Sequence, residues 1–383
     1  MRQLLLLLIT ILPLACAAQP QAKGDSVSTP PTTRADTLSL LFVGDLMQHQ
    51  AQIDAARTPS GGYDYSPCFA LVEDDVRRAD WAVANLEVTL AGKPYKGYPA
   101  FSAPDEFLAA IHEAGFDVLV TANNHSLDRG RKGLERTIQL LDSLRMPHAG
   151  TYASATSRAA RYPLLLEKKG IRVGLLNYTY GTNGLAVSPP NVVNYIDTAL
   201  IARDIAACQA MRPDVIIACM HWGVEYQSNP SREQKRLADW LLEKGVDHII
   251  GSHPHVAQPI EVRTDSLTRK KHLVVYSLGN YISNMSARNT DGGLTVRMYL
   301  VKDSVSTRLV ASDYSLVWTA RPAQTGEKNY QLIPIDAPLD SIRSAPIDSL
   351  PQAARDSLKL FAKTTRALLE KYNQGIRERL PQQ

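Results

Sequence analysis

The chain contains the stretch Asp117-Val118-Leu119-Val120-Thr121-Ala122-Asn123-Asn124-His125, in which an apolar run is followed directly by two carboxamides and an imidazole. The apolar part suits a buried strand of a parallel sheet, whereas the polar cluster has no use inside such a strand. In open α/β sheets the ligand site lies beyond the carboxyl ends of the strands. We therefore predict that Asn124 and His125 stand at the tip of a strand, in a functional site.

Other apolar runs of the chain end in the same way. The runs 38–43, 81–84, 214–219, 247–250 and 272–276 are followed in turn by Asp45 with His49, Glu87, His221, His253 with His255, and Asn280. Turn residues unrelated to a site should fall at both ends of strands. Because these polar residues fall at one end, we predict that the strand tips converge on one site.

Helical patterns alternate with the predicted strands. Apolar residues recur at helical spacing in 133–144, and helices are also predicted for 104–114, 199–211 and 231–244. The segments 162–166 and 171–176 read as a hairpin, and 293–301 and 306–318 as two late strands. Such alternation is typical of an α/β fold. The late strands indicate that not every strand is parallel, so we predict two packed sheets with helices on both outer faces.

Composition excludes several classes of function. The chain has 383 residues, 44% apolar content and a net charge of +4, with no run of Lys or Arg, so nucleic acid is not an expected partner. The sequence lacks the Gly-x-Ser-x-Gly elbow of serine hydrolases, a P-loop and a Rossmann glycine fingerprint. A substrate carrying negative charge would have to be recognised by local charge.

The ligand set at the strand tips consists of carboxylates, one carboxamide and imidazoles, without a thiolate. Such a set suits Zn, Mn, Fe or Ni better than a thiophilic metal. Two divalent cations roughly 3.5–4 Å apart, bridged by one carboxylate, would activate a water. Each residue also has an ordinary structural explanation: turn histidines at His253 and His255, a backbone hydrogen bond for His221, a surface carboxylate at Glu87, and a turn or helix N-cap at Asp45. Their joint position at strand ends favours a metal centre.

The N-terminus is typical of an export signal. Arg2 precedes the apolar run 4–14 and the small residues Ala15-Cys16-Ala17-Ala18. We therefore predict a signal peptide over 1–18 and an exported protein of the periplasm or cell envelope. Ordinary cleavage and acylation of Cys16 as a lipoprotein are the two alternatives.

The rest of the chain divides into three parts. Residues 19–37 are rich in Ser, Thr, Pro and charge and read as a disordered tether. Residues 38–320 form the predicted domain, and 321–383 a loop-rich stretch followed by an amphipathic helix that packs on the domain. The apolar stripe of that helix is predicted to contain Leu358, Phe361, Leu368, Tyr372 and Ile376.

Six motifs occur in the order that is typical of one protein family. They are Gly44-Asp45-Leu46-Met47, Asn85-Leu86-Glu87, Ala122-Asn123-Asn124-His125-Ser126-Leu127-Asp128, His221-Trp222-Gly223-Val224-Glu225-Tyr226, Gly251-Ser252-His253-Pro254-His255 and Tyr276-Ser277-Leu278-Gly279-Asn280. With them the chain resembles the CapA-type capsule-synthesis proteins, which are associated with poly-γ-glutamate, over residues 38–318. That family is similar in turn to the calcineurin-like metallophosphoesterases. The resemblance implies a metallo-dependent phosphatase-like fold, a four-layer α/β/β/α sandwich, with a dinuclear metal site.

The resemblance also implies roles for individual residues. The expected metal ligands are Asp45, Glu87 as the bridge, Asn124, His221, His253 and His255, with His125 as the catalytic acid. We expect substrate contacts from His49, Asn123, Arg129, Glu225 and Asn280. Met47 departs from the phosphoesterase pattern because it stands where a second His ligand belongs, and Glu87 replaces an Asp. One metal position is therefore expected to be weaker, unless His49 compensates.

These inferences lead to a main hypothesis and two alternatives. The main hypothesis is an exported metal-dependent hydrolase or transferase that acts on an extracellular anionic polymer, poly-γ-glutamate or a related glutamyl amide, or on a small-molecule substrate. Activated water would attack a carbonyl and His125 would protonate the leaving group. Lys93, Lys96 and Arg129 would meet substrate carboxylates, with solvated surface as the alternative reading. The other two hypotheses are a metallophosphoesterase and a non-catalytic envelope component that works with membrane-bound capsule-synthesis partners.

Overall fold

The computed structural model describes residues 37–338 and 345–380. The predicted signal peptide, with Cys16, and the predicted tether apart from Thr37 lie outside the described residues. Within the described part, no helix is long and apolar enough to cross a membrane. The described cysteines, Cys68, Cys208 and Cys219, are buried free thiols.

The larger of two sheets has a parallel half and an antiparallel half. Its parallel strands are β1 (Thr37–Leu46), β2 (Trp81–Leu86), β3 (Val118–Val120) and β4 (His148–Ala149), side by side in that order. On the other side of β1 follow the antiparallel strands β14 (Gly292–Lys302), β15 (Thr307–Ala320) and β16 (Gln331–Ile335). Two short strands complete the sheet: β13 (Asn280–Ile282) pairs with the end of β1, and β17 (Arg377–Glu378) pairs with β15.

The second sheet has a parallel centre with antiparallel edges. Its order is β11 (Ile260–Thr264), β12 (Lys271–Val275), β10 (His248–Ser252), β9 (Val215–His221), β7 (Ile171–Thr179) and β6 (Leu164–Lys168). The predicted hairpin over 162–176 is confirmed, because β6 and β7 pair antiparallel around a tight turn. A separate two-stranded ribbon joins β5 (Thr151–Tyr152) to β8 (Val192–Val193).

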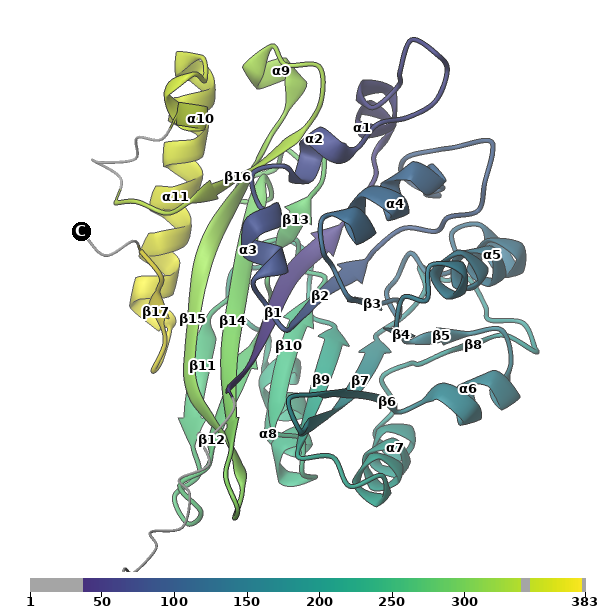
Figure 1. Cartoon of the computed structure of the whole chain (residues 1–383), viewed down its shortest axis with the longest axis vertical. Helices are drawn as coiled ribbons and strands as arrows, with labels where there is room; N and C mark the ends of the chain where they lie inside the picture. Colours follow the sequence, from purple (N-terminus) through teal and green to yellow (C-terminus); the bar gives the residue numbers. More distant parts are fainter. Residues whose placement is uncertain (1–36, 339–344, 381–383) are drawn as a thin grey trace, which may run out of the picture. The chain divides into compact units, whose positions relative to one another are not determined.

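The two sheets pack face to face and helices cover their outer faces (Figure 1). Side chains such as Phe42 from β1 and Ile217 from β9 belong to one buried apolar cluster between the sheets. Helices α2 (Ser66–Phe69), α3 (Glu73–Arg77) and α4 (Asp105–Glu113) pack on the larger sheet, and α7 (Thr198–Ala210) and α8 (Arg232–Glu243) on the smaller one. The prediction of a four-layer α/β/β/α sandwich is confirmed.

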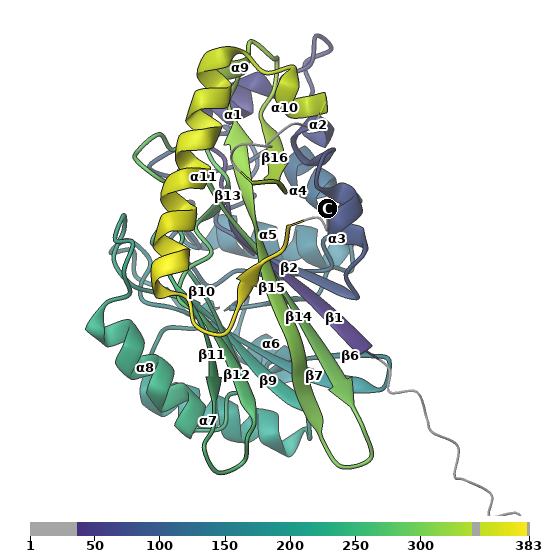
Figure 2. The ribbon, with the colours of Figure 1, turned by 90° about the vertical axis from the view of Figure 1, so that its left-hand side faces the viewer.

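The remaining helices lie at the margins of these layers. They are α1 (Gln50–Ala55), α5 (Gly130–Ser143), α6 (Ala155–Arg161), α9 (Pro322–Thr325), α10 (Ala345–Asp348) and α11 (Gln352–Tyr372). Helix α11 runs alongside β15 (Figure 2), and its Leu358 and Phe361 join the cluster between the sheets.

One expectation about the C-terminal part is wrong in detail. The stretch 322–351, expected to be loop-rich, contains the short helices α9 and α10 and the edge strand β16. Strand β16 includes Pro334, which is compatible with an edge position because an edge strand can spare a donor. The helix ends at Tyr372, so Ile376 lies outside it. Its buried face includes Leu369, while Leu368 is half-buried and Tyr372 is 39% exposed.

Gly44 allows the strand that carries Asp45 to approach its neighbour. A Cβ atom on Gly44 would lie 1.9 Å from the carbonyl oxygen of Gly279. With glycine there, the Asp45 amide donates to that same oxygen at 3.0 Å, and Asp45 pairs in register with Asn280. The sequence thereby brings two polar strand tips side by side at the edge where the parallel strands end.

Candidate metal centre

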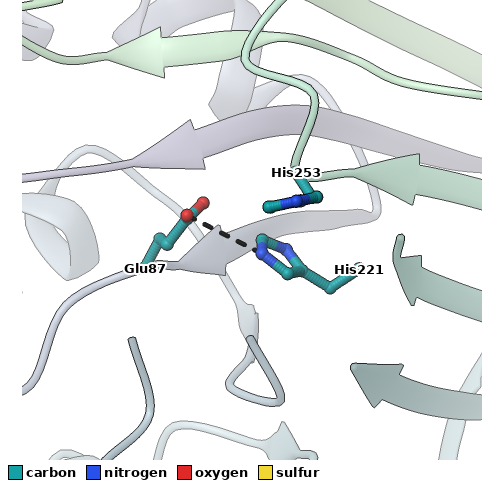
Figure 3. A group of neighbouring side chains, drawn as sticks. All are labelled: Glu87, His221 and His253. Atoms are coloured by element: carbon teal, nitrogen blue, oxygen red, sulfur yellow. Dashed lines mark ion pairs between the residues drawn. The ribbon is translucent and has the colours of Figure 1, made fainter. Parts of the chain in front are cut away.

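The carboxyl ends of the strands from both sheets place six predicted ligands in one buried cluster. Asp45 lies in β1, Glu87 follows β2, Asn124 follows β3, His221 ends β9, and His253 and His255 follow β10. All six are at most 3% exposed. Figure 3 shows Glu87 facing His221 and His253, which lie next to each other. The fold therefore brings together, at the carboxyl ends of strands, residues that are up to 210 positions apart in the sequence, from Asp45 to His255. This is the convergence that we predicted from the polar residues after the apolar runs.

The distances within the cluster are those of groups that share a site. Glu87 Oε1 lies 3.7 Å from His221 Nε2 and 3.9 Å from His255 Nε2. On the far side, His255 Nδ1 lies 3.3 Å from Asp45 Oδ2. His221 Nε2 is 2.8 Å from Asn124 Oδ1. Glu87 thus lies between two sets of candidate ligands.

Two groups of three residues could each hold a cation, and Glu87 belongs to both. One group is Glu87, His221 and His253, and the other is Asp45, Glu87 and His255. Within each group the nitrogen and oxygen atoms lie within 4.8 Å of one another. Glu87, the expected bridge, is the residue that these two groups share. The assignment of these residues as ligands stays a prediction.

Several buried polar atoms of the cluster have no hydrogen-bond partner among the described residues. They are Asp45 Oδ2, Glu87 Oε1 and His253 Nδ1. Leaving a buried polar group unpaired costs roughly 1–3 kcal/mol, and more for a charged group, so such groups are rare without an ion or water. A bound divalent cation would give these oxygen atoms, and an imidazole nitrogen, the partner that they lack. The residues present therefore fit a divalent metal ion.

The backbone of the turn that carries His253 and His255 is strained. Their φ angles are +98° and +59°, in a region that side chains other than glycine rarely occupy. Such conformations persist where the surrounding structure enforces them and gather at functional sites. A hydrogen bond from the loop after β9 stabilises this turn: the amide of Tyr226 donates to the carbonyl of Pro254 at 2.8 Å.

Burial and neighbouring charged groups set the protonation of the cluster. Burial, and then the charge of Asp45, raise the pKa of Glu87 well above its ordinary value. Burial, and then the neighbouring His255, lower the pKa of His253 to about 3, and burial followed by His253 lowers the pKa of His221. For His255 the effect of burial is outweighed by the hydrogen bond and charge of Asp45, so its pKa is raised instead. The neutral imidazoles of His221 and His253 are ready to bind a cation, whereas Glu87 must release its proton to do so.

Asn280 and Asn123 are fully buried, and their amide groups are used within the protein. Asn280 Oδ1 lies 3.0 Å from His255 Nδ1, and its Nδ2 donates to the carbonyl of Thr290 at 2.8 Å. Asn123 Nδ2 donates to the carbonyl of Leu86 at 2.7 Å. An acceptor on Nδ1 leaves Nε2 of His255 free for metal, which is the usual arrangement around metal-binding histidines. This geometry favours a positioning role for both residues over the predicted substrate contact.

His125 forms a dyad with an acidic residue of the same motif. Its Nδ1 lies 2.8 Å from Asp128 Oδ2, and the same carboxylate oxygen accepts the amide of Phe101 at 2.8 Å. The edge of the imidazole packs against the Phe101 ring, with centroids 4.6 Å apart. Asp128 therefore fixes the orientation of the ring, and Nε2 forms no hydrogen bond within the described part of the chain. A group held in this way suits proton transfer.

His49 and Arg129 stand apart from the candidate ligand groups. His49 precedes α1, where its Nδ1 lies 3.2 Å from Gln52 Oε1 and accepts the amide of Asn284 at 3.3 Å. Among the described residues, His49 belongs to none of the candidate ligand groups, so whether it compensates for Met47 stays a prediction. Arg129 is half-buried, and its guanidinium forms no ion pair or hydrogen bond with another described residue; its contact with substrate stays a prediction.

One residue of the centre was missed at the sequence level. The Nδ2 atom of Asn85 donates to Asp45 Oδ1 at 2.8 Å and to Glu87 Oε2 at 3.1 Å, and lies 3.3 Å from His221 Nδ1. Its Oδ1 accepts from Asn123 at 3.1 Å. The sequence could have indicated this role, because side chains alternate along a strand, and residues 85 and 87 therefore lie on the same face.

Comparison with known proteins places the chain in a sequence family. The family model described as "Bacterial capsule synthesis protein PGA_cap" matches residues 39–285. The capsule biosynthesis protein CapA of Bacillus anthracis is 27% identical over 278 residues, a match that spans 69% of this chain and 64% of that protein. The PGA biosynthesis protein CapA of Bacillus subtilis is 27% identical over 277 residues, or 70% of this chain and 69% of that protein.

Solved structures give a more distant likeness. The calcineurin-like phosphoesterase YfkN from Bacillus subtilis aligns with 86% of this chain and 98% of that chain, at 15% identity and a TM-score of 0.44.

Proposed function

We propose, because this chain belongs to the bacterial capsule synthesis protein family PGA_cap, that it is a metal-dependent hydrolase or transferase of capsule biosynthesis. The names of the two CapA relatives support a role in making a capsule polymer. The substrate class that we propose is poly-γ-glutamate or a related anionic glutamyl polymer. Its partners would then be membrane-bound proteins of polymer synthesis.

The observation that carries the proposal is the buried centre with Glu87 shared between two ligand groups, next to the His125–Asp128 dyad. Divalent cations in such a centre lower the pKa of water and polarise a substrate oxygen. Asp128 holds the Nδ1 side of the ring, so Nε2 of His125 is the atom that exchanges a proton with the leaving group. Asn280 and Asn85 keep the ligands oriented while this proton moves.

Unpaired cations near the dyad fit an anionic polymer. Lys93 and Lys96 belong to the loop that ends at Phe101, whose amide bonds to Asp128. Both lysines are exposed, and their side chains, like that of Arg129, form no ion pair with described residues. Free cationic side chains of this kind bind carboxylates of a polymer and raise its local concentration.

The test of the reaction is an assay of the metal-loaded full chain on two substrate classes. Cleavage or transfer of poly-γ-glutamate, followed by chain length and by new amino groups, is the expected result, with His125→Ala inactive. Turnover of a phosphodiester without action on the polymer would favour the phosphoesterase hypothesis. Inactivity on both, together with a co-purifying envelope protein, would favour the non-catalytic one.

We also propose that the protein is exported, on the basis of the sequence of its first 18 residues. Mass spectrometry should find a mature chain that begins after residue 15, 17 or 18. An added lipid mass on Cys16 would show that the protein is processed as a lipoprotein. An intact Met1 in a cytoplasmic fraction would contradict export.

A further inference from the structure

The candidate cation position between Asp45, Glu87 and His255 lacks one ligand of the phosphoesterase pattern. Met47 occupies the sequence position of that ligand, but its side chain is buried in the apolar cluster under α4. The Nδ1 atom of His49 accepts the amide of Asn284 instead, and the His49 amide donates to Gln52 Oε1. Neither residue completes the set, so any further protein ligand has to come from another part of the chain.

We propose that Glu225 is this ligand, so that the divalent cation held by Asp45, Glu87 and His255 is completed by a carboxylate from the loop after β9. Glu225, His253 and His255 form the third group whose donor atoms lie within 4.8 Å of one another. The inference rests on the metal centre of the proposed function, and it replaces the predicted role of Glu225 in substrate binding.

The loop that carries Glu225 is built to hold it against the two histidines. Gly223 has a φ of +93°, and Tyr226 takes the left-handed conformation with a φ of +66°. The amide of Tyr226 donates to the carbonyl of Pro254 at 2.8 Å, between His253 and His255. This hydrogen bond joins the turn at Tyr226 to the turn at His253 and His255, next to the place where Glu225 approaches the two imidazoles. Backbone strain of this kind persists only where other contacts enforce it.

The surroundings of Glu225 contain atoms that need a cation. Asp45 Oδ2 and His253 Nδ1 are buried without a hydrogen-bond partner in the described structure. Among residues 37–338 and 345–380, no Lys or Arg forms an ion pair with Glu225, Glu87 or Asp45. With two divalent cations bound, the carboxylates of Asp45, Glu87 and Glu225 would leave the centre with a net charge of about +1. Such a charge suits a centre that attracts an anionic substrate. Glu225 is also accessible to solvent, so it can close the outer side of the centre.

The experiment compares Glu225→Gln with Glu233→Gln, using Mn²⁺ alone as the probe. Glu233 is an exposed carboxylate in the first turn of α8, eight residues further along, and it forms no ion pair. The full chain is stripped with EDTA, and Mn²⁺ binding is followed by calorimetry and electron paramagnetic resonance. Loss of a residue that hydrogen-bonds a metal ligand lowers metal affinity roughly 10–100-fold. Loss of a ligand itself should therefore lower the affinity for the second Mn²⁺ ion by about 100-fold or more.

The expected result has three parts. Wild type and Glu233→Gln bind two ions with the spectrum of a coupled pair, whereas Glu225→Gln binds one ion tightly and gives the spectrum of an isolated Mn²⁺. The deficit persists in 1 M KCl, because salt screens an effect of charge alone but does not replace a ligand. Circular dichroism should show an intact fold, since the substitution keeps the shape of an accessible side chain.

Two results would overturn the assignment. If Glu225→Gln bound both ions as wild type does, or if its deficit vanished in 1 M KCl, Glu225 would not be a ligand while the metal centre itself stood. If wild type bound no Mn²⁺ at all, both the centre of the proposed function and this inference would fail.

Discussion

Replacing Asn85 by alanine removes an amide group that lies among three candidate ligands. Its Nδ2 donates to Asp45 and Glu87 at 2.8 and 3.1 Å. A hydrogen bond to a charged group contributes roughly 1.5–3 kcal/mol, so two amount to about 3–6 kcal/mol if nothing replaces them. Water can enter the space, so the lower figure applies, and about 3 kcal/mol corresponds to roughly 100-fold in binding. Mutation of a residue that hydrogen-bonds a metal ligand typically lowers metal affinity roughly 10–100-fold, which agrees with this value.

We therefore expect Asn85→Ala to bind Mn²⁺ about 100-fold more weakly than wild type, because its carboxylates hold their protons more firmly. The assay is calorimetric titration of EDTA-stripped protein, with circular dichroism to verify the fold. Asn229→Ala is the matched control, since Asn229 is exposed in the loop after β9 and its side chain forms no hydrogen bond with described residues. An affinity of Asn85→Ala within twofold of wild type would refute the reasoning.

Three further predictions follow from the same geometry. His125→Ala and Asp128→Asn should keep the bound metal, and His125→Ala should lose roughly 10²–10⁴-fold in rate; loss of metal in proportion to activity would make His125 a ligand. Because burial and then Asp45 raise the pKa of Glu87 above 4.5, folding of the metal-free chain favours the protonated form. The stability of wild type relative to Glu87→Gln should therefore fall as pH rises from about 4.5 towards neutrality, and parallel thermal-melting profiles would contradict this. Gly44→Ala should destabilise the fold by about 3 kcal/mol or more in denaturant titrations, since its Cβ would lie 1.9 Å from the Gly279 carbonyl; an unchanged midpoint would show that β1 and β13 can separate.

The sequence was sufficient to place the cluster because one rule applies to every strand that supplies a ligand. Buried parallel strands read as apolar runs, and polar residues just beyond their carboxyl ends meet at one edge of the sheet. Asp45, Glu87 and His221 were located in this way, although they come from two different sheets. Resemblance to a family then supplied the expected ligand roles, with Glu87 as the bridge, which the periodicity could not give.

Asn85 was missed although strand alternation places it on the same face as Glu87, whereas the ligand role that we propose for Glu225 depends on loop geometry. The position of Glu225 is set by the positive φ of Tyr226 and by its bond to Pro254, and neither can be read from composition. His49 was expected to contact substrate or to compensate for Met47; it belongs to none of the candidate ligand groups of the described residues, and its Nδ1 accepts the amide of Asn284. The short strand β16 was missed because Pro334 interrupts its apolar run.

The most direct test of the centre is the metal content of Glu87→Ala. A carboxylate can bridge two cations, and without the bridge two like charges would lie close together with nothing between them. Elemental analysis of purified protein loaded with Mn²⁺ should find about two ions per chain in wild type. We predict one or fewer in Glu87→Ala, with no activity. Two ions retained in Glu87→Ala would contradict a centre that Glu87 bridges.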